Sequence, residues 1–64
     1  MIDHRDFSVV VKQRGRLPDP WKWEIYRAGR TSPINQSKGF FKTATEARQQ
    51  GKKALQLFLS EFQD

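Results

Sequence analysis

The 64-residue chain lacks cysteine, has a single histidine and contains no long apolar run. Without cysteine it can form neither the disulfides that hold many small secreted domains nor a thiolate metal site. No apolar stretch approaches the roughly 18 residues needed to span a membrane, and the polar, acidic start MIDHRDF is unlike a signal peptide. We therefore expect a soluble cytoplasmic protein that has no membrane partner and is held together by hydrophobic packing.

The short chain and its single histidine also argue against catalytic activity. A domain of this size buries only about 60% of the surface that its unfolded chain exposes, which leaves little room for a deep pocket. No nucleophile has a second histidine to activate it, and no glycine-rich phosphate loop is recognisable. His4, Asp3 and Asp6 have metal-ligand chemistry, but they lie in one short terminal stretch without a rigid frame. We expect no catalytic activity, no metal and no cofactor.

Positive charge is concentrated in the middle of the chain. Residues 12–53 contain eleven of the twelve lysines and arginines but only three acidic residues, a local excess of eight positive charges. A compact basic region of this kind favours polyanionic partners such as nucleic acid, although excess charge also serves solubility. Both interpretations stay open at this point.

Two stretches, residues 7–12 (FSVVVK) and 21–28 (WKWEIYRA), alternate as β-strands do. Their apolar members share one face and are Phe7, Val9, Val11, Trp21, Trp23 and Ile25. The intervening segment QRGRLPDP is rich in turn residues and predicts a loop longer than a tight hairpin turn. A third strand is expected within residues 34–42, where Gly39 predicts a bulge.

A helix is predicted over residues 43–62. Thr43 and Glu46 have the spacing of a capping box, in which the threonine accepts from the N3 amide and the glutamate accepts from the cap amide. Apolar and small residues follow at spacings of three and four, namely Ala44, Ala47, Gly51, Ala54, Leu55, Phe58 and Phe62. Because Gly51 lies on this apolar face, we expect it to contact a bulky side chain, Trp21 or Trp23.

These elements predict one α+β domain over residues 1–64. Three antiparallel strands are followed by one C-terminal helix packed on one face of the sheet, in the order β-β-β-α. Ile34 and Phe41 are expected to join the apolar residues above in the core. The other side of the sheet, here called the outer face, has no second layer in the sequence to cover it. Its expected members are Ser8, Val10, Lys12, Lys22, Glu24, Tyr26, Lys38, Phe40 and Lys42.

The outer face and the first loop contain the candidate binding residues. Lysine neutralises phosphate, arginine presents a planar fork to phosphate oxygens, and aromatic rings stack on bases. The predicted nucleic-acid-binding residues are Lys12, Arg14, Arg16, Lys22, Tyr26, Lys38 and Lys42. The alternative is a protein-interaction module or homodimer in which Val10, Tyr26 and Phe40 are buried against another chain. An ordinary solvated sheet face is a third interpretation.

The segment FKTATEA (residues 41–47), preceded by the Trp-rich strand and Gly39, resembles the arm-site DNA-binding domain of phage and transposon tyrosine integrases. The resemblance covers about residues 21–55 and implies a three-stranded sheet that enters the DNA major groove. By this resemblance the contacts would come from Lys12, Lys22, Tyr26, Lys38 and Lys42, although Glu24 would interrupt that surface. Over its whole length the chain also resembles a group of small stand-alone bacterial proteins of uncharacterised function with a W-x-W-E-I-Y strand, which implies no mechanism.

Overall fold

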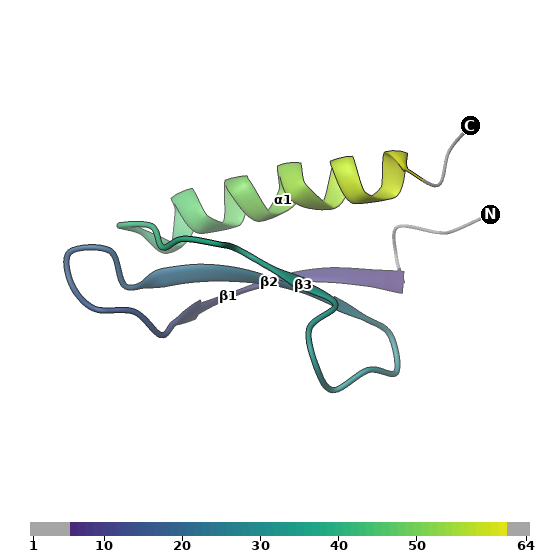
Figure 1. The fold of residues 1–64 in the computed structure, drawn as a ribbon, viewed down its shortest axis with the longest axis horizontal. Coiled ribbons are helices and arrows are strands. Elements are labelled where there is room, and N and C mark those ends of the chain that lie inside the picture. Colours follow the sequence, from purple (N-terminus) through teal and green to yellow (C-terminus); the bar gives the residue numbers. More distant parts are fainter. Residues whose placement is uncertain (1–5, 62–64) are drawn as a thin grey trace.

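The computed structural model describes residues 6–61, which form three β-strands followed by one α-helix (Figure 1). The strands are β1 (Phe7–Gln13), β2 (Trp21–Arg27) and β3 (Asn35–Gln36), and the helix is α1 (Ala44–Ser60). The sheet is antiparallel, in the order β1-β2-β3, and α1 lies across one of its faces. The predicted β-β-β-α arrangement of the α+β class is therefore confirmed.

β1 and β2 form the regular part of the sheet. All seven residues of each strand are paired, and the central pair is Val10 with Glu24. β-branched and aromatic side chains, which dominate both strands, favour this extended pairing. At the base of the connecting loop, the amides of Arg14 and Gly15 both donate to the Pro20 carbonyl at 2.9 Å. The two strands are thus joined by a closed loop rather than by a tight turn.

β3 is shorter than the strand predicted over residues 34–42. Its two residues pair with Glu24 and Ile25, and regular pairing then stops. Pairing resumes at Phe41, which exchanges backbone hydrogen bonds of 2.7 and 3.0 Å with Trp21. If the pairing of Gln36 with Glu24 continued without interruption, residue 39 would lie opposite Trp21. Phe41 lies there instead, so the chain between Gln36 and Phe41 contains two extra residues. This excursion lies where Gly39 predicts a bulge.

The core lies between α1 and the helix-facing side of β1 and β2. Ile25 is fully buried, and Phe7 and Trp23 are also buried. The rings of Phe58 and Phe7 meet edge to face, with centroids 5.5 Å apart. The side chains packed around the buried centre are Val9, Val11, Phe41, Ala54, Leu55, Phe58 and Leu59. The core positions predicted for these residues are confirmed, apart from Leu59, which was not among the predicted core residues.

Ile34 differs from the prediction that it joins the core, because its side chain is 37% exposed. The register pairs Ile25 with Asn35, so Asn35 rather than Ile34 takes the helix-facing position on β3. Even Asn35 is exposed there, because α1 packs mainly on β1 and β2. The third strand therefore contributes to the core through Phe41 instead.

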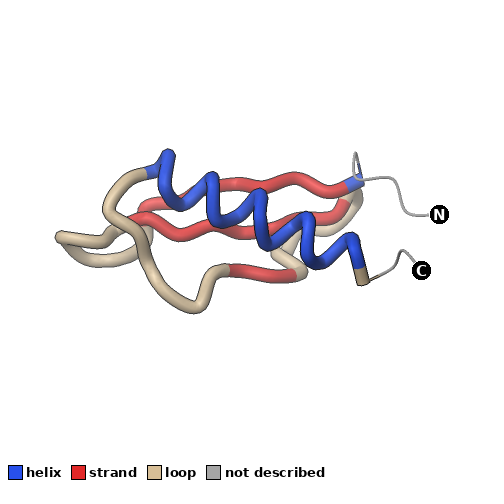
Figure 2. Tube along the Cα trace, turned by 90° about the horizontal axis from the view of Figure 1, so that it is seen from above, coloured by secondary structure: helices blue, strands red, loops and turns tan. Residues whose placement is uncertain are grey.

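Gly51 lies at the closest approach between α1 and the sheet, which the helix crosses obliquely (Figure 2). A β-carbon at this position would lie 2.6 Å from Val9 Cγ1 and 2.9 Å from Trp23 Cβ. Both separations are well below a normal carbon–carbon contact. The predicted contact between Gly51 and a tryptophan is confirmed, and that tryptophan is Trp23.

The helix begins at the predicted cap. Thr43 Oγ1 accepts a hydrogen bond from the Glu46 amide at 3.1 Å. In the expected capping box the Glu46 carboxylate accepts from the Thr43 amide. In the structure it accepts from the amide one residue earlier, that of Lys42, at 3.3 Å. α1 ends at Ser60, and Phe62, the predicted last residue, lies outside the described residues.

Candidate functional site

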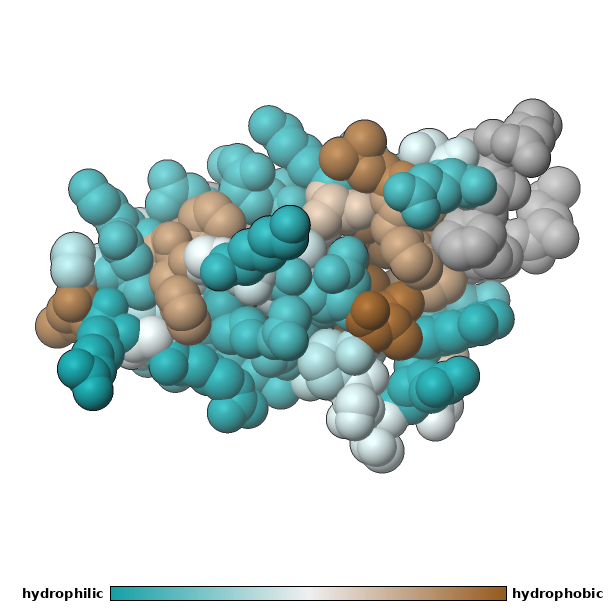
Figure 3. All heavy atoms as spheres, viewed as in Figure 1, coloured by the Kyte–Doolittle hydropathy of each residue, from teal (hydrophilic) through white to brown (hydrophobic). Residues whose placement is uncertain are grey.

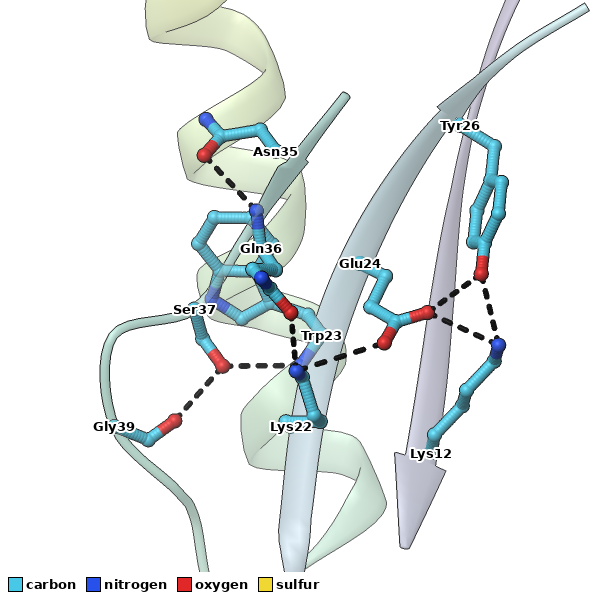
Figure 4. A network of polar contacts seen from close by, with 9 residues as sticks. All are labelled: Lys12, Lys22, Trp23, Glu24, Tyr26, Asn35, Gln36, Ser37 and Gly39. Atoms are coloured by element: carbon cyan, nitrogen blue, oxygen red, sulfur yellow. Dashed lines mark hydrogen bonds and ion pairs between the residues drawn. The ribbon is translucent and has the colours of Figure 1, made fainter. Parts of the chain in front are cut away.

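A carboxylate lies at the centre of the outer face. Glu24 is in the middle of β2, and it is only 5% exposed although no helix or strand of residues 6–61 covers this side of the sheet. Lys12 Nζ lies 3.0 Å from Glu24 Oε1, and Lys22 Nζ lies 3.5 Å from Glu24 Oε2. The two lysine side chains reach the carboxylate from opposite sides and shield it from water (Figure 4).

Tyr26 and Gln36 extend this group of polar side chains. The Tyr26 hydroxyl donates to Glu24 Oε1 at 2.7 Å and accepts from Lys12 Nζ at 2.8 Å. Lys22 Nζ donates to Gln36 Oε1, so the contacts span all three strands (Figure 4). We call Lys12, Lys22, Glu24, Tyr26 and Gln36 the Glu24 cluster. Every member has a partner within it, and the cluster takes the place of a covering layer.

Strand alternation explains why the charges meet. Lys12 and Lys22 are directly opposite one another in the β1–β2 ladder and point to the same face. Like charges at opposite ladder positions repel each other. Glu24 lies two residues beyond Lys22 on that face and pairs with both ammonium groups. Two of the lysines expected to bind phosphate are therefore already paired.

The surroundings of Glu24 alter its titration. Burial raises the pKa of Glu24, but hydrogen bonds from Tyr26 and Lys12 and the positive charges of Lys12 and Lys22 outweigh burial, so the net pKa is lowered. Hydrogen bonds, first to Tyr26 and then to Glu24, raise the pKa of Lys12. Both shifts favour the charged forms, so the ion pair between Lys12 and Glu24 is present at neutral pH.

The remaining predicted cations gather at one end of the sheet. Phe40 packs against Gly15 in the β1–β2 loop, since a β-carbon on Gly15 would lie 2.6 Å from Phe40 Cδ2. This contact joins two segments that are distant in sequence, residues 13–20 and 37–42, beside the start of α1 (Figure 1). We define the loop end as this contact together with the four cations one or two residues from it, Arg14, Arg16, Lys38 and Lys42.

The cations of the loop end differ from those of the Glu24 cluster. All four are exposed, and none has an ion pair with another residue of the described range 6–61. Asp19 and Glu46 are the acidic residues of the neighbouring segments, so positive charge remains in excess. Phe40 is 46% exposed, and Leu17 in the same loop is 83% exposed. The loop end thus combines unpaired cations with accessible apolar side chains.

Of the three residues of the protein-interface alternative, Val10 and Tyr26 lie near each other on the outer face and Phe40 lies apart from them. Val10 is half-buried opposite Glu24, Tyr26 is bound into the Glu24 cluster, and Phe40 lies at the loop end against Gly15. On the face displayed in Figure 3, hydrophilic side chains predominate and apolar side chains form small separate groups. The structure therefore divides the predicted nucleic-acid-binding residues between the Glu24 cluster and the loop end, and it separates Phe40 from Val10 and Tyr26.

Sequence reasoning placed Glu24 within the outer face, and the alternation of Lys22 and Glu24 on one strand face was a signal for the ion pair that forms there. The contact between Gly15 and Phe40 had no such signal. Within residues 6–61 no three or more histidine, cysteine, aspartate or glutamate residues are grouped to hold a metal. His4 and Asp3 lie outside the described residues.

Comparison with known protein families, curated proteins and solved structures finds no match to this chain. Of what the resemblance to integrase arm-site domains implies, the structure bears out only a three-stranded antiparallel sheet followed by a C-terminal helix. In the part of the chain that the structure describes, no helix has the length and apolar character needed to cross a membrane.

Proposed function

We propose that the protein binds nucleic acid through the loop end, with its four cations on phosphates and Phe40 on a base. The observation that supports this proposal is the contact of Phe40 with Gly15, which brings the two segments that carry the unpaired cations together beside an exposed ring. Phosphate contacts supply most sequence-independent affinity, and an aromatic side chain adds about 1 to 3 kcal/mol for a stacked base. The loop end offers both contributions.

The Glu24 cluster is the less suitable surface for this role. A phosphate that approaches Lys12 or Lys22 meets the carboxylate of Glu24, with which both lysines are paired. A phosphate would have to compete with this carboxylate for each lysine, and drawing a lysine away would break its contact with Glu24. The proposed surface is therefore at the end of the sheet, not at its centre.

The exposure of Phe40 indicates the form of nucleic acid. Gly15 covers one part of the ring, so the ring offers a single stacking platform. Bases in a duplex are already stacked on their neighbours, whereas unpaired bases are free to stack on protein side chains. We therefore propose a preference for single-stranded over duplex nucleic acid.

Fluorescence anisotropy with labelled single-stranded and duplex oligonucleotides, measured at several salt concentrations, tests the proposal. Replacing the four loop-end cations by glutamine removes up to four phosphate contacts. The slope of log affinity against log salt should then shrink by up to about 2.8 for a single strand. A matched control removes four charges elsewhere, at Arg30, Arg48, Lys52 and Lys53. Equal losses in the two variants, or no binding by the unmodified protein, would contradict the proposal.

A second pair of variants isolates the stacking contribution. Phe40→Ser should weaken binding of a single strand about tenfold, because it removes the proposed platform. Leu57→Ser is the control, since Leu57 is a comparably exposed apolar side chain on α1, away from the loop end. If both variants bind single strands as the unmodified protein does, Phe40 has no stacking role.

A further inference from the structure

The two edges of the sheet differ in how they are protected. β3 has only two paired residues, and the excursion around Gly39 interrupts the strand beyond them. β1 has seven residues, FSVVVKQ, and it is an edge strand: within residues 6–61 no strand pairs with the edge that points away from β2 (Figure 2). Natural proteins usually protect such an edge with proline, a bulge or charged side chains. β1 has no proline and no bulge, and its one charged side chain, Lys12, is paired with Glu24 on β2.

Backbone hydrogen bonds identify which groups of β1 face outward. At the ends of the β1–β2 ladder, the Ala28 amide donates to the Asp6 carbonyl at 2.7 Å and the Arg14 amide donates to the Pro20 carbonyl at 2.9 Å. Hydrogen-bonded pairs alternate along an antiparallel ladder, so the even-numbered residues of β1 bond to β2. The backbone groups that point away from the sheet belong to Phe7, Val9, Val11 and Gln13.

We propose that this edge pairs with β1 of a second copy of the chain, antiparallel and about a two-fold axis at Val10. This register pairs Phe7 with Gln13 and Val9 with Val11 of the partner subunit, so the outward amides and carbonyls meet each other. All seven residues of both strands are then paired in one continuous sheet. Moving the axis by one residue would leave two residues of each β1 without a partner within the strand.

Charge complementarity supports a second copy as the occupant. In this register Arg14 lies opposite Asp6 of the partner subunit, and the symmetry repeats the pair. Both residues are exposed, and within the described range neither has an ion pair in its own chain. Lys12 lies opposite Ser8 of the partner subunit, so no like charges face each other across the axis. The antiparallel arrangement also keeps the two basic loop ends at opposite ends of the joined sheet, where Arg16, Lys38 and Lys42 of each copy stay available to phosphate when Arg14 is paired across the axis.

Sedimentation equilibrium over a range of protein concentrations tests this interface. The unmodified protein should show a reversible monomer–dimer equilibrium. Asp6→Arg and Arg14→Asp should each raise the dimer dissociation constant about tenfold, because two attractive pairs become repulsive. The double variant restores both pairs with the charges exchanged, and it should recover the original dissociation constant.

Val10→Lys is an independent variant, because it places two ammonium groups next to each other at the axis and should also weaken the dimer. Thr31→Lys adds the same charge in the β2–β3 turn, away from β1, and should leave association unchanged. Circular dichroism checks that each variant is folded. A protein that stays monomeric at every concentration overturns the proposal, as does a dimer that these β1 variants leave intact. Neither result depends on oligonucleotide binding, so the test is separate from that of the proposed function.

Discussion

The phenol of Tyr26 donates a 2.7 Å hydrogen bond to the carboxylate of Glu24, two residues earlier on the same strand. The same hydroxyl accepts from Lys12, so one side chain links the acid to its base. These contacts account for an acidic residue that is 5% exposed on a face with no covering helix or strand in the described range. The outer face is thus stabilised by its own polar side chains, and its stability depends on all of them.

Tyr26→Phe should reduce the free energy of unfolding by about 0.5 to 1.5 kcal/mol, because it keeps the ring but removes the hydroxyl from Glu24 and Lys12. It should also raise the pKa of Glu24, since a hydrogen bond that lowers this pKa is lost. Urea unfolding and NMR titration of the carboxyl group measure the two effects. Ser60→Ala, which removes an exposed hydroxyl at the end of α1, is the control and should change neither quantity appreciably.

The stability contributed by Glu24 should depend on pH. Its pKa is lower in the folded state than the ordinary value of 4.5, so its contribution is complete above that value and is lost as pH falls through the folded pKa. Glu24→Gln should cost about 1 to 3 kcal/mol at pH 7, since hydrogen bonds to a charged group are lost. Denaturant unfolding should show this difference shrinking in acid below pH 4.5. If the two proteins still differ by the same free energy of unfolding at the lowest pH, the charge of Glu24 is not responsible for the difference.

Two glycine substitutions should act in opposite directions. Gly51→Ala places a β-carbon against Val9 and Trp23, so we expect a net loss of up to about 2 kcal/mol even though alanine is the better helix former. Gly39→Ala meets no atom within 4 Å and should be neutral or stabilising, by up to about 1 kcal/mol. Thermal unfolding of the two variants side by side measures the difference. Stabilisation by Gly51→Ala would mean that α1 lies farther from the sheet.

Thr43→Ala should reduce the free energy of unfolding by about 1 kcal/mol, because it leaves the Glu46 amide without its capping oxygen. Thr45→Ala is the control, since Thr45 is an exposed residue inside the helix and does not cap it. Urea denaturation of both variants tests the contribution of the cap. Because alanine is a better helix former than threonine, Thr45→Ala should be neutral or stabilising, and an equal loss at both positions would contradict a specific role for the cap.

The parts of the fold that could be predicted are those set by periodicity. Alternation correctly placed Trp23 and Ile25 toward the helix, and three- and four-residue spacing correctly placed Gly51. The third strand was less predictable, because its apolar residues fit more than one register. Phe41 joins the core while Ile34 stays exposed, because residues seven apart on a strand face opposite sides. The two-residue excursion between them keeps this parity, and no local pattern specifies such an insertion.

The candidate site was predictable only in its residue types. The sequence shows which residues are basic, but their distribution in space depends on contacts between separate elements. Lysine is long enough to turn toward a neighbouring strand, as Lys12 does toward Glu24, and strand alternation alone does not determine that choice. The contact between Gly15 and Phe40 likewise arises only when the first loop and the third strand fold against the same end of β2.

The short pairing of β3 has a consequence for local opening. Its segment is held by few backbone bonds, among them Ile34 to Ile25 and Ser37 to Trp23, whereas α1 packs mainly on β1 and β2. The third strand can therefore detach while the hairpin and helix remain packed, at a small part of the free energy of global unfolding. Amide hydrogen exchange at Ile34 and Ser37 should accordingly be faster than at Val10. Each such opening would also free Lys22 from Gln36 and expose the second edge of β2.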